Sequence, residues 1–222
     1  MKEDIDRIRQ NSKKLISELP EHVTLLAAAK ARSIEEVEAA YEGGIRHFGH
    51  NYVQEAHEMI PNAVFKARWH MIGHLQRNKA RQALDLFDMV ESLDSLKLAQ
   101  ELEKRCQQQN RDIDVLIEVN SGLESEKTGV PPGQVESLAM EISPLKQVHL
   151  VGLMTMGPFT GDPQLARPYF VKTRTLFERL GNLKIPNVDM RVLSMGMSNS
   201  YHVAIEEGAN LVRIGTLIFG AR

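Results

Sequence analysis

Eight short apolar runs alternate with helical patterns along this chain of 222 residues, and that alternation limits the fold more than any other feature. The runs have the length of buried strands, and apolar residues recur between them at helical spacing. Strands separated by such crossovers pair in parallel. The predicted strands are residues Val23–Ala29, Ile45–Phe48, Ala67–Ile72, Met89–Ser92, Asp114–Val119, Val148–Met154, Asp189–Leu193 and Leu211–Ile214.

Eight strand–helix units in this length predict an α/β fold, a single (β/α)8 TIM barrel that forms one domain over residues 1–222. A doubly wound open sheet is the alternative, but eight units leave no residues for a second domain. An amphipathic segment with Ile5, Ile8, Leu15 and Ile16 precedes the first strand, and few residues follow the last one. We therefore expect an extra N-terminal helix and no eighth C-terminal helix.

Some helix boundaries can be predicted from capping residues. Ser33 and Glu36 have the spacing of a capping box, and Gly43 follows the apolar stripe of that helix as a stop signal. Asp94 is expected to cap the helix with Leu98, Leu102 and Cys106 on one face, and Gly181 is expected to end the helix predicted in "GDPQLARPYFVKTRTLFERLG".

Composition and charge exclude several classes of protein. The net charge of -2 argues against a surface for nucleic acid or anionic membrane. No apolar run reaches the length needed to cross a bilayer, and the charged start of the chain lacks the apolar core of a signal peptide. The single cysteine, Cys106, excludes an internal disulfide and is typical of a reducing compartment. We expect a cytoplasmic protein.

A lysine ends the first predicted strand, in the stretch "HVTLLAAAKAR". Side chains that perform chemistry in TIM barrels lie at the C-terminal ends of strands, where Lys30 is placed. Lysine is also the residue that forms Schiff bases with carbonyl compounds. The alternative is a boundary residue whose ammonium group simply reaches solvent.

The C-terminal stretch has features of a phosphate site. Residues 194–200 are small and polar, and they lead from the seventh strand into a helix expected to start near Ser198. Gly215 and Thr216 follow the eighth strand and offer N–H and hydroxyl donors. Barrels commonly bind phosphate after these two strands, at helix N-termini. The alternative is that Gly196 and Gly215 only turn the chain.

A metal site is not expected. His70 and His74 have the four-residue spacing of a helical pair, but His70 lies in a predicted strand and Gly73 separates the two. No acidic or cysteine ligand completes a tetrahedral set at a recognised spacing.

Several long motifs resemble one family. The stretches "FGHNYVQE", "WHMIGHLQRNK", "LSMGMS" and "VRIGTLIFGAR" are similar to those of the pyridoxal phosphate homeostasis proteins, also called the YggS or PROSC family. The resemblance implies a barrel like the N-terminal domain of bacterial alanine racemase, with pyridoxal 5′-phosphate as cofactor. It implies that Lys30 forms the covalent aldimine, that Arg213 faces the pyridine nitrogen, and that Asn51, Ser198, Gly215 and Thr216 also bind the cofactor.

The chain departs from the family pattern at two places. His50 replaces a glutamate, and Asn199-Ser200 replaces an acidic pair, both expected beside the site. Neither departure removes an implied cofactor contact. Since arginine stays protonated, Arg213 cannot exchange a proton with the ring nitrogen, and the bound cofactor should be a weak electron sink.

The resemblance implies a protein that stores, buffers or delivers pyridoxal phosphate, with no catalytic residue assigned and no efficient turnover. Pyridoxal-phosphate-dependent apoenzymes are the expected partners, and a monomer or weak dimer is the expected state. Two alternatives stay open at this point. One is a pyridoxal-phosphate-dependent amino-acid racemase, which would need a second proton donor opposite Lys30. The other is a phosphosugar-binding barrel enzyme, because this fold hosts many chemistries.

Overall fold

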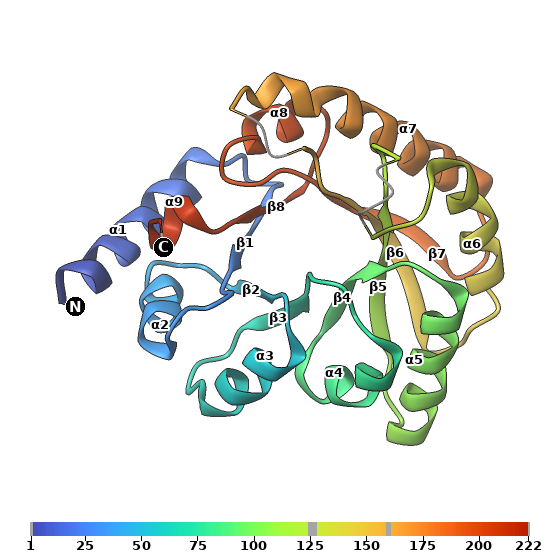
Figure 1. Ribbon diagram of the computed structural model, residues 1–222, viewed down its shortest axis with the longest axis horizontal. Helices are drawn as coiled ribbons and strands as arrows, with labels where there is room; N and C mark the ends of the chain where they lie inside the picture. The colour runs from blue at the N-terminus through green and yellow to red at the C-terminus, as the bar shows by residue number, and fades with distance from the viewer. Residues whose placement is uncertain (1, 124–127, 159–160, 222) are drawn as a thin grey trace.

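The computed structural model describes residues 2–123, 128–158 and 161–221. Their strands pair in parallel in chain order, and β8 pairs with β1 to close the barrel (Figure 1). This confirms the predicted fold, and each strand boundary lies within about two residues of its expected place. The strands are β1 (Thr24–Ala28), β2 (His47–His50), β3 (Arg68–Met71), β4 (Met89–Leu93), β5 (Ile113–Val119), β6 (Val148–Thr155), β7 (Val188–Ser194) and β8 (Leu211–Ile214).

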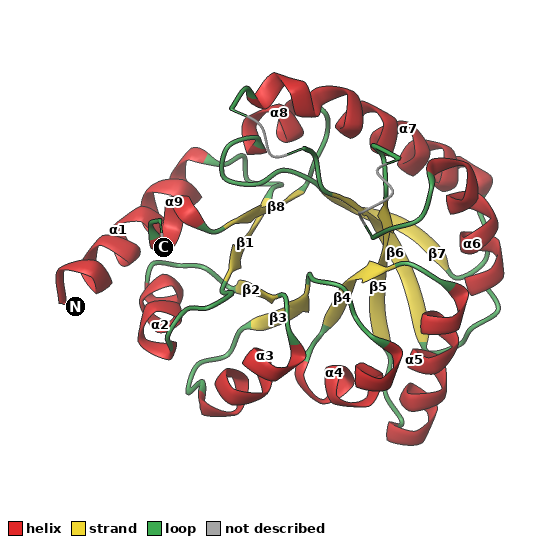
Figure 2. Ribbon diagram, viewed as in Figure 1, coloured by secondary structure: helices red, strands yellow, loops and turns green. Residues whose placement is uncertain are grey.

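Helices surround the barrel on the outside (Figure 2). None of the helices in the described residues is long and apolar enough to cross a membrane. The helices are α1 (Lys2–Glu18), α2 (Ile34–Glu42), α3 (Val53–Met59), α4 (Ala80–Leu86), α5 (Leu96–Gln109), α6 (Val135–Ile142), α7 (Arg167–Leu183), α8 (Tyr201–Glu206) and α9 (Thr216–Phe219).

The two ends of the chain meet on one side of the barrel, where α1 packs beside α9 and α2 (Figure 1). The N-terminal helix is as expected, and it buries Ile8 and Leu15. The expectation of no helix after the last strand is wrong, because β8 is followed by the single turn α9. Asn11 of α1 donates to the carbonyl of Ile218 at 3.1 Å, which satisfies a backbone group at the end of that turn.

One helix boundary matches the capping signal and two differ. Ser33 and Glu36 form the predicted capping box of α2. The cap of α5 is Ser95 rather than Asp94, because the Ser95 hydroxyl accepts from the Leu98 N–H. Helix α7 continues past Gly181 to Leu183 and ends at Lys184 in the left-handed conformation. A glycine inside a helix costs only about 1 kcal/mol, which the rest of this long helix offsets.

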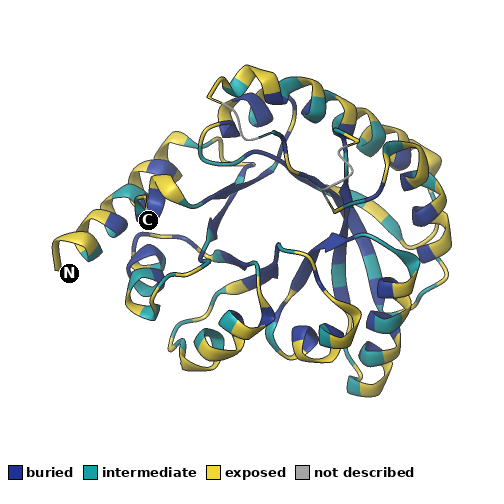
Figure 3. Ribbon diagram, in the orientation of Figure 1, coloured by how far each residue is buried: buried dark blue, intermediate teal, exposed yellow. Residues whose placement is uncertain are grey.

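Alternate residues of each strand face opposite sides of the barrel wall. Leu25 and Ala27 belong to the layer between the strands and the helices, whereas Leu26 packs inside the barrel with Ile72 and Leu211. Most strand residues are buried, except in the first half of β7, and exposed residues lie mainly on the outer helix faces (Figure 3). Buried polar side chains, among them Glu91 and Arg213, also face the interior.

Candidate functional site

Lys30 lies just beyond β1, at the C-terminal end of the barrel. Ala29 continues the pairing with β2, since its N–H donates to the Gly49 carbonyl at 2.9 Å. Leu26 and Ala28 face the interior, so the alternation of the strand places Lys30 on the inner side of the mouth. Its side chain is half-buried, and its Nζ lies 5.6 Å from the centre of the Tyr52 ring.

The turn after Lys30 is fixed by a contact from α3. Ala31 has a φ of 54°, a left-handed conformation that is unusual for a residue with a side chain. Its N–H donates to the Glu55 carboxylate at 3.2 Å, which holds the chain in this turn. Arg32 then donates to the carbonyl of Gly220 at 2.8 Å and ties the turn to the C-terminus. Lys30 therefore sits between a strand and an anchored turn.

The expected phosphate-binding residues come together. Ser198 Oγ accepts from the Gly215 N–H at 3.3 Å, and the Arg213 N–H donates to the Gly196 carbonyl at 3.0 Å. The register of β8 against β1 places Gly215 beside Ala28, two residues before Lys30. Thr216 begins α9 and is exposed. Ser198, Gly215 and Thr216 therefore lie near the strand that carries Lys30.

The loop before α8 differs from expectation at its helix start. The helix begins at Tyr201 rather than near Ser198, which lies in the preceding turn. Gly196 has a φ of +90°, and a Cβ on it would lie 2.6 Å from the Ala204 Cβ, so only glycine fits this turn. Ser200 is buried, and its hydroxyl accepts from the Met197 N–H at 3.3 Å.

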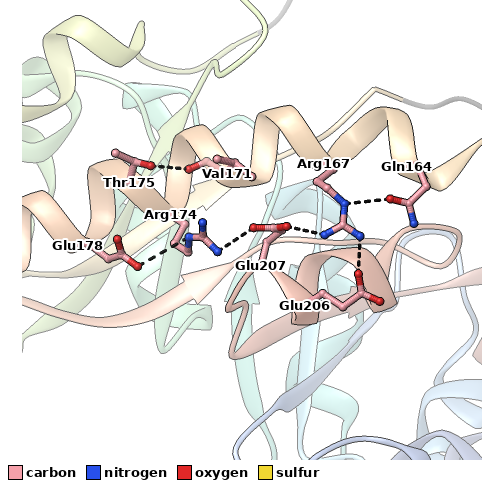
Figure 4. Close-up of polar contacts among 8 residues, drawn as sticks. All are labelled: Gln164, Arg167, Val171, Arg174, Thr175, Glu178, Glu206 and Glu207. Atoms are coloured by element: carbon pink, nitrogen blue, oxygen red, sulfur yellow. Dashed lines mark hydrogen bonds and ion pairs between the residues drawn. The ribbon is translucent and has the colours of Figure 1, made fainter.

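A cluster of ion pairs fastens α8 to α7 on the outside of the barrel (Figure 4). The Glu207 carboxylate, just after α8, accepts from Arg167 with one oxygen and from Arg174 with the other. Arg167 also pairs with Glu206 and bonds Gln164 at 2.9 Å. Because the loop of residues 195–200 leads directly into α8, these ion pairs, which form a clamp between α7 and α8, also help to fix the position of that loop.

Asn51 directly follows β2, and its backbone packs closely against Gly73. A Cβ on Gly73 would lie 2.4 Å from the Asn51 carbonyl oxygen, so the two segments touch without a side chain between them. Asn51 is half-buried and lines a cavity of about 450 Å³, with Tyr52, His74 and Lys79 also in its wall. It thus lies at the same C-terminal end as Lys30, beside Tyr52.

The residues that depart from the family pattern, His50 and Asn199-Ser200, lie in different surroundings. His50 was expected beside the site, but it faces outward between β2 and α3, where its ring stacks on Trp69 at 5.7 Å. Neither ring nitrogen of His50 has a hydrogen-bond partner among the described residues, and burial lowers the pKa of the ring to about 4. Asn199 is exposed, whereas Ser200 holds the loop. His50 is therefore not part of the mouth.

Arg213 lies inside the barrel and is almost fully buried. Its Nη2 donates to the Thr155 carbonyl at 2.9 Å, and its Nη1 donates to the Ser194 hydroxyl. Ser194 in turn donates to Glu91 at 2.6 Å. Burial lowers the pKa of Arg213, while the charges of Glu91 and Glu118 oppose that shift. The guanidinium therefore has fixed partners below the barrel mouth.

The histidines singled out as a possible metal pair lie in different surroundings. His70 is inside the barrel, with its Nδ1 2.7 Å from Glu91 and its Nε2 3.1 Å from His47. His74 is half-exposed at the rim and pairs with Asp94 at 3.1 Å. Among the described residues, no group of three or more histidine, cysteine, aspartate or glutamate side chains is arranged to hold a metal ion.

Glu91 is the residue that the sequence analysis missed. It was included only as part of an apolar strand, yet it joins His70 to Ser194 and Arg213. The signal was present, because Met89 and Glu91 are two residues apart and share the inner face of β4. An acidic residue at an inward position of a barrel strand indicates a buried polar partner.

Comparison with known proteins identifies the family of this chain. The family model described as "Alanine racemase, N-terminal domain" matches residues 4–222. A pyridoxal phosphate homeostasis protein of Aquifex aeolicus is 42% identical over 201 residues, which cover 89% of this chain and 86% of that protein. The chain belongs to the pyridoxal phosphate homeostasis protein family. This confirms the family resemblance seen in the motifs.

Solved structures include a member of the same family. PipY of Synechococcus elongatus, solved with pyridoxal phosphate bound, is 32% identical, with a TM-score of 0.88 over 96% of this chain and 100% of that one. Alanine racemase of Clostridium difficile has a TM-score of 0.85 at 15% identity and is matched over 57% of its length. The second likeness shows the fold alone.

Proposed function

We propose that this member of the pyridoxal phosphate homeostasis family binds pyridoxal 5′-phosphate at the C-terminal mouth of its barrel and stores, buffers or delivers it. The Lys30 amine lies at the C-terminal end of β1, Ser198 follows β7, and Gly215 and Thr216 follow β8, and this placement supports the proposal most directly. The cofactor found in the PipY structure supports it.

The donor set fits this cofactor. An aldehyde condenses with the Lys30 amine, forming a C=N bond and releasing one water. A phosphate dianion is matched by hydroxyl and N–H donors. Ser198 and Thr216 supply hydroxyls, and Gly215 supplies an N–H, which donates to Ser198 Oγ in this structure. Arg213 offers a permanent cation with N–H donors toward the ring nitrogen, and Asn51 adds a polar side chain beside the mouth. We assign these six residues to the cofactor.

Carrying is favoured over turnover by the groups around the mouth. Arg213 does not exchange protons near neutral pH, so the ring nitrogen facing it stays unprotonated and stabilises a carbanion poorly. Racemisation also needs an acid on the face opposite Lys30. Tyr52 contacts the Lys30 amine itself, and Tyr201 is buried in the core with its pKa raised by burial. Neither tyrosine is placed for that role.

Further parts of the proposal come from the sequence. We propose that residues 1–222 act as one cofactor-binding domain in the cytoplasm, as a monomer or weak dimer, and that apoenzymes dependent on pyridoxal phosphate receive the cofactor.

Two parallel incubations test the function. The loaded protein is mixed with an apoenzyme that requires pyridoxal phosphate, and separately with L-alanine, L-serine or L-lysine in D2O. We expect the apoenzyme to gain activity and the amino acids to keep their α-protons. Rapid α-proton exchange that disappears in Lys30→Ala would instead make the protein a racemase-like enzyme. A loaded protein that releases no cofactor to any apoenzyme would contradict delivery.

A further inference from the structure

Glu91 lies inside the barrel with both carboxylate oxygens engaged. It comes from β4 and has no exposed surface. One oxygen accepts from the Ser194 hydroxyl at 2.6 Å, and the other accepts from His70 Nδ1 at 2.7 Å. A buried carboxylate is costly unless it is paired in this way. The contacts therefore hold Glu91 in one orientation.

The same carboxylate governs how Ser194 meets Arg213. The serine hydroxyl has one hydrogen, and it uses it to donate a hydrogen bond to Glu91. A lone pair of the oxygen is thereby turned toward Arg213, whose Nη1 donates to it. The Thr155 carbonyl holds Nη2 at 2.9 Å, so both terminal nitrogens of Arg213 are fixed.

Glu91 is also the stronger counter-charge to Arg213. Its nearer oxygen is 3.8 Å from Nη1 of Arg213. Burial opposes the charged form of Glu91, but the hydrogen bonds from His70 and Ser194 and the charges of His70 and Arg213 outweigh it, so its pKa is lowered. Glu118 also faces Arg213, but burial raises its pKa. Glu91 is thus the carboxylate whose charged form its contacts favour beside the guanidinium.

We propose that Glu91, acting through Ser194, is a positioning residue that sets the orientation and charge balance of Arg213 toward the cofactor ring. This inference rests on the proposed function. It explains why the linked polar side chains of His70, Glu91, Ser194 and Arg213 cross the barrel below the mouth, where apolar residues would otherwise pack. Groups near a ring nitrogen tune the electronic state of a bound cofactor, so Glu91 affects the bound cofactor without touching it.

The test compares Glu91→Gln with a matched control, Glu103→Gln. Glutamine keeps the size of Glu91 but removes the charge and one of its two acceptors. Glu103 is another buried carboxylate, and it accepts from the N–H groups of Lys146, Gln147 and Val148 at the start of β6, the opposite end of the barrel from the mouth. Replacing it removes a buried charge without touching Arg213.

Three quantities are measured for each protein at neutral pH. These are the dissociation constant for pyridoxal phosphate by dialysis, the absorbance spectrum of the bound cofactor, and the urea midpoint of the unloaded protein. We expect Glu91→Gln to weaken retention by tenfold or more and to shift the absorbance maximum. Glu103→Gln should lower the urea midpoint while retention and spectrum stay as in the wild type.

The outcomes separate this inference from the proposed function. A loaded wild type whose spectrum and retention are unchanged by Glu91→Gln overturns the positioning role alone. Equal spectral shifts in the Glu91 and Glu103 variants would also overturn it. A wild type that retains no cofactor overturns the proposed function and the inference with it. If Glu91→Gln does not fold, Ser194→Ala takes its place, because it leaves Glu91 intact and should give the same direction of shift.

Discussion

Protonation of the buried His50 ring is expected to lower the free energy of unfolding as the pH falls. The ring is buried against Trp69 with no hydrogen-bond partner for either nitrogen among the described residues. Burial lowers its pKa to about 4 from an ordinary value near 6.5. The unfolded chain therefore binds more protons at this site than the folded one. The contribution of neutral His50 is complete above the unfolded pKa, and it is lost as pH falls toward the folded pKa.

The size of the loss follows from those two pKa values. Linkage between them gives a cost of about 2 kcal/mol on going from pH 7 to pH 5, and at most about 3.4 kcal/mol at full protonation. Leucine at position 50 does not titrate and leaves no buried ring nitrogen without a partner. The free energy of unfolding of His50→Leu minus that of the wild type should therefore be about 2 kcal/mol larger at pH 5 than at pH 7.

Urea titrations of both proteins at pH 7 and pH 5 measure this difference. His47, whose pKa is also lowered to about 4, chiefly by burial, titrates in both proteins and cancels. The exposed His57→Gln variant is the control and should stay within about 0.5 kcal/mol of wild type. A difference between His50→Leu and wild type that is the same at both pH values would refute the reasoning.

Four further substitutions test the site and its supports. Ser198→Ala and Thr216→Ala should each weaken retention of pyridoxal phosphate, measured by dialysis, by about tenfold to a hundredfold, because each removes a donor to a dianion. Retention of pyridoxal, which has no phosphate, should change little. Equal losses for both ligands would place the phosphate elsewhere. Gly73→Ala should displace Asn51 and reduce cofactor retention in a protein that circular dichroism shows to be folded, and full retention would remove Asn51 from the site. Glu207→Gln should lower the free energy of unfolding in urea by about 1.5–3 kcal/mol, since it weakens two charged hydrogen bonds, whereas unchanged stability would show that the clamp contributes nothing.

The barrel was predictable from sequence because its signals are local and repeated. Each strand is a short apolar run, and each crossover has helical spacing, so eight consistent units determine the topology together. The short helix α9 was missed since only a few residues remain after β8, too few for a periodic pattern. The start of α8 was placed too early because serine at position 198 is as suitable for a turn as for a helix cap.

The site was predictable only in part, for a physical reason. Lys30 and Gly215 are near strand ends, and topology alone brings strand ends together. Side chains alternate between the two faces of a strand, so the direction of His50 depends on whether β2 extends as far as that residue. The predicted strand stops at Phe48, and it therefore did not settle which face His50 takes. Contacts such as Glu91 to Ser194 join strands far apart in the chain, which no local pattern reports.

Borohydride reduction followed by peptide mapping tests the central assignment most directly. Reduction converts a C=N bond between cofactor and lysine into a stable secondary amine, so the pyridoxyl group marks the lysine that carried it. The account predicts that the label lies on Lys30, that the visible absorbance of the loaded protein disappears on reduction, and that Lys30→Ala stays folded but takes no label. A label found chiefly on another lysine, or a Lys30→Ala variant labelled as strongly as wild type, would contradict it.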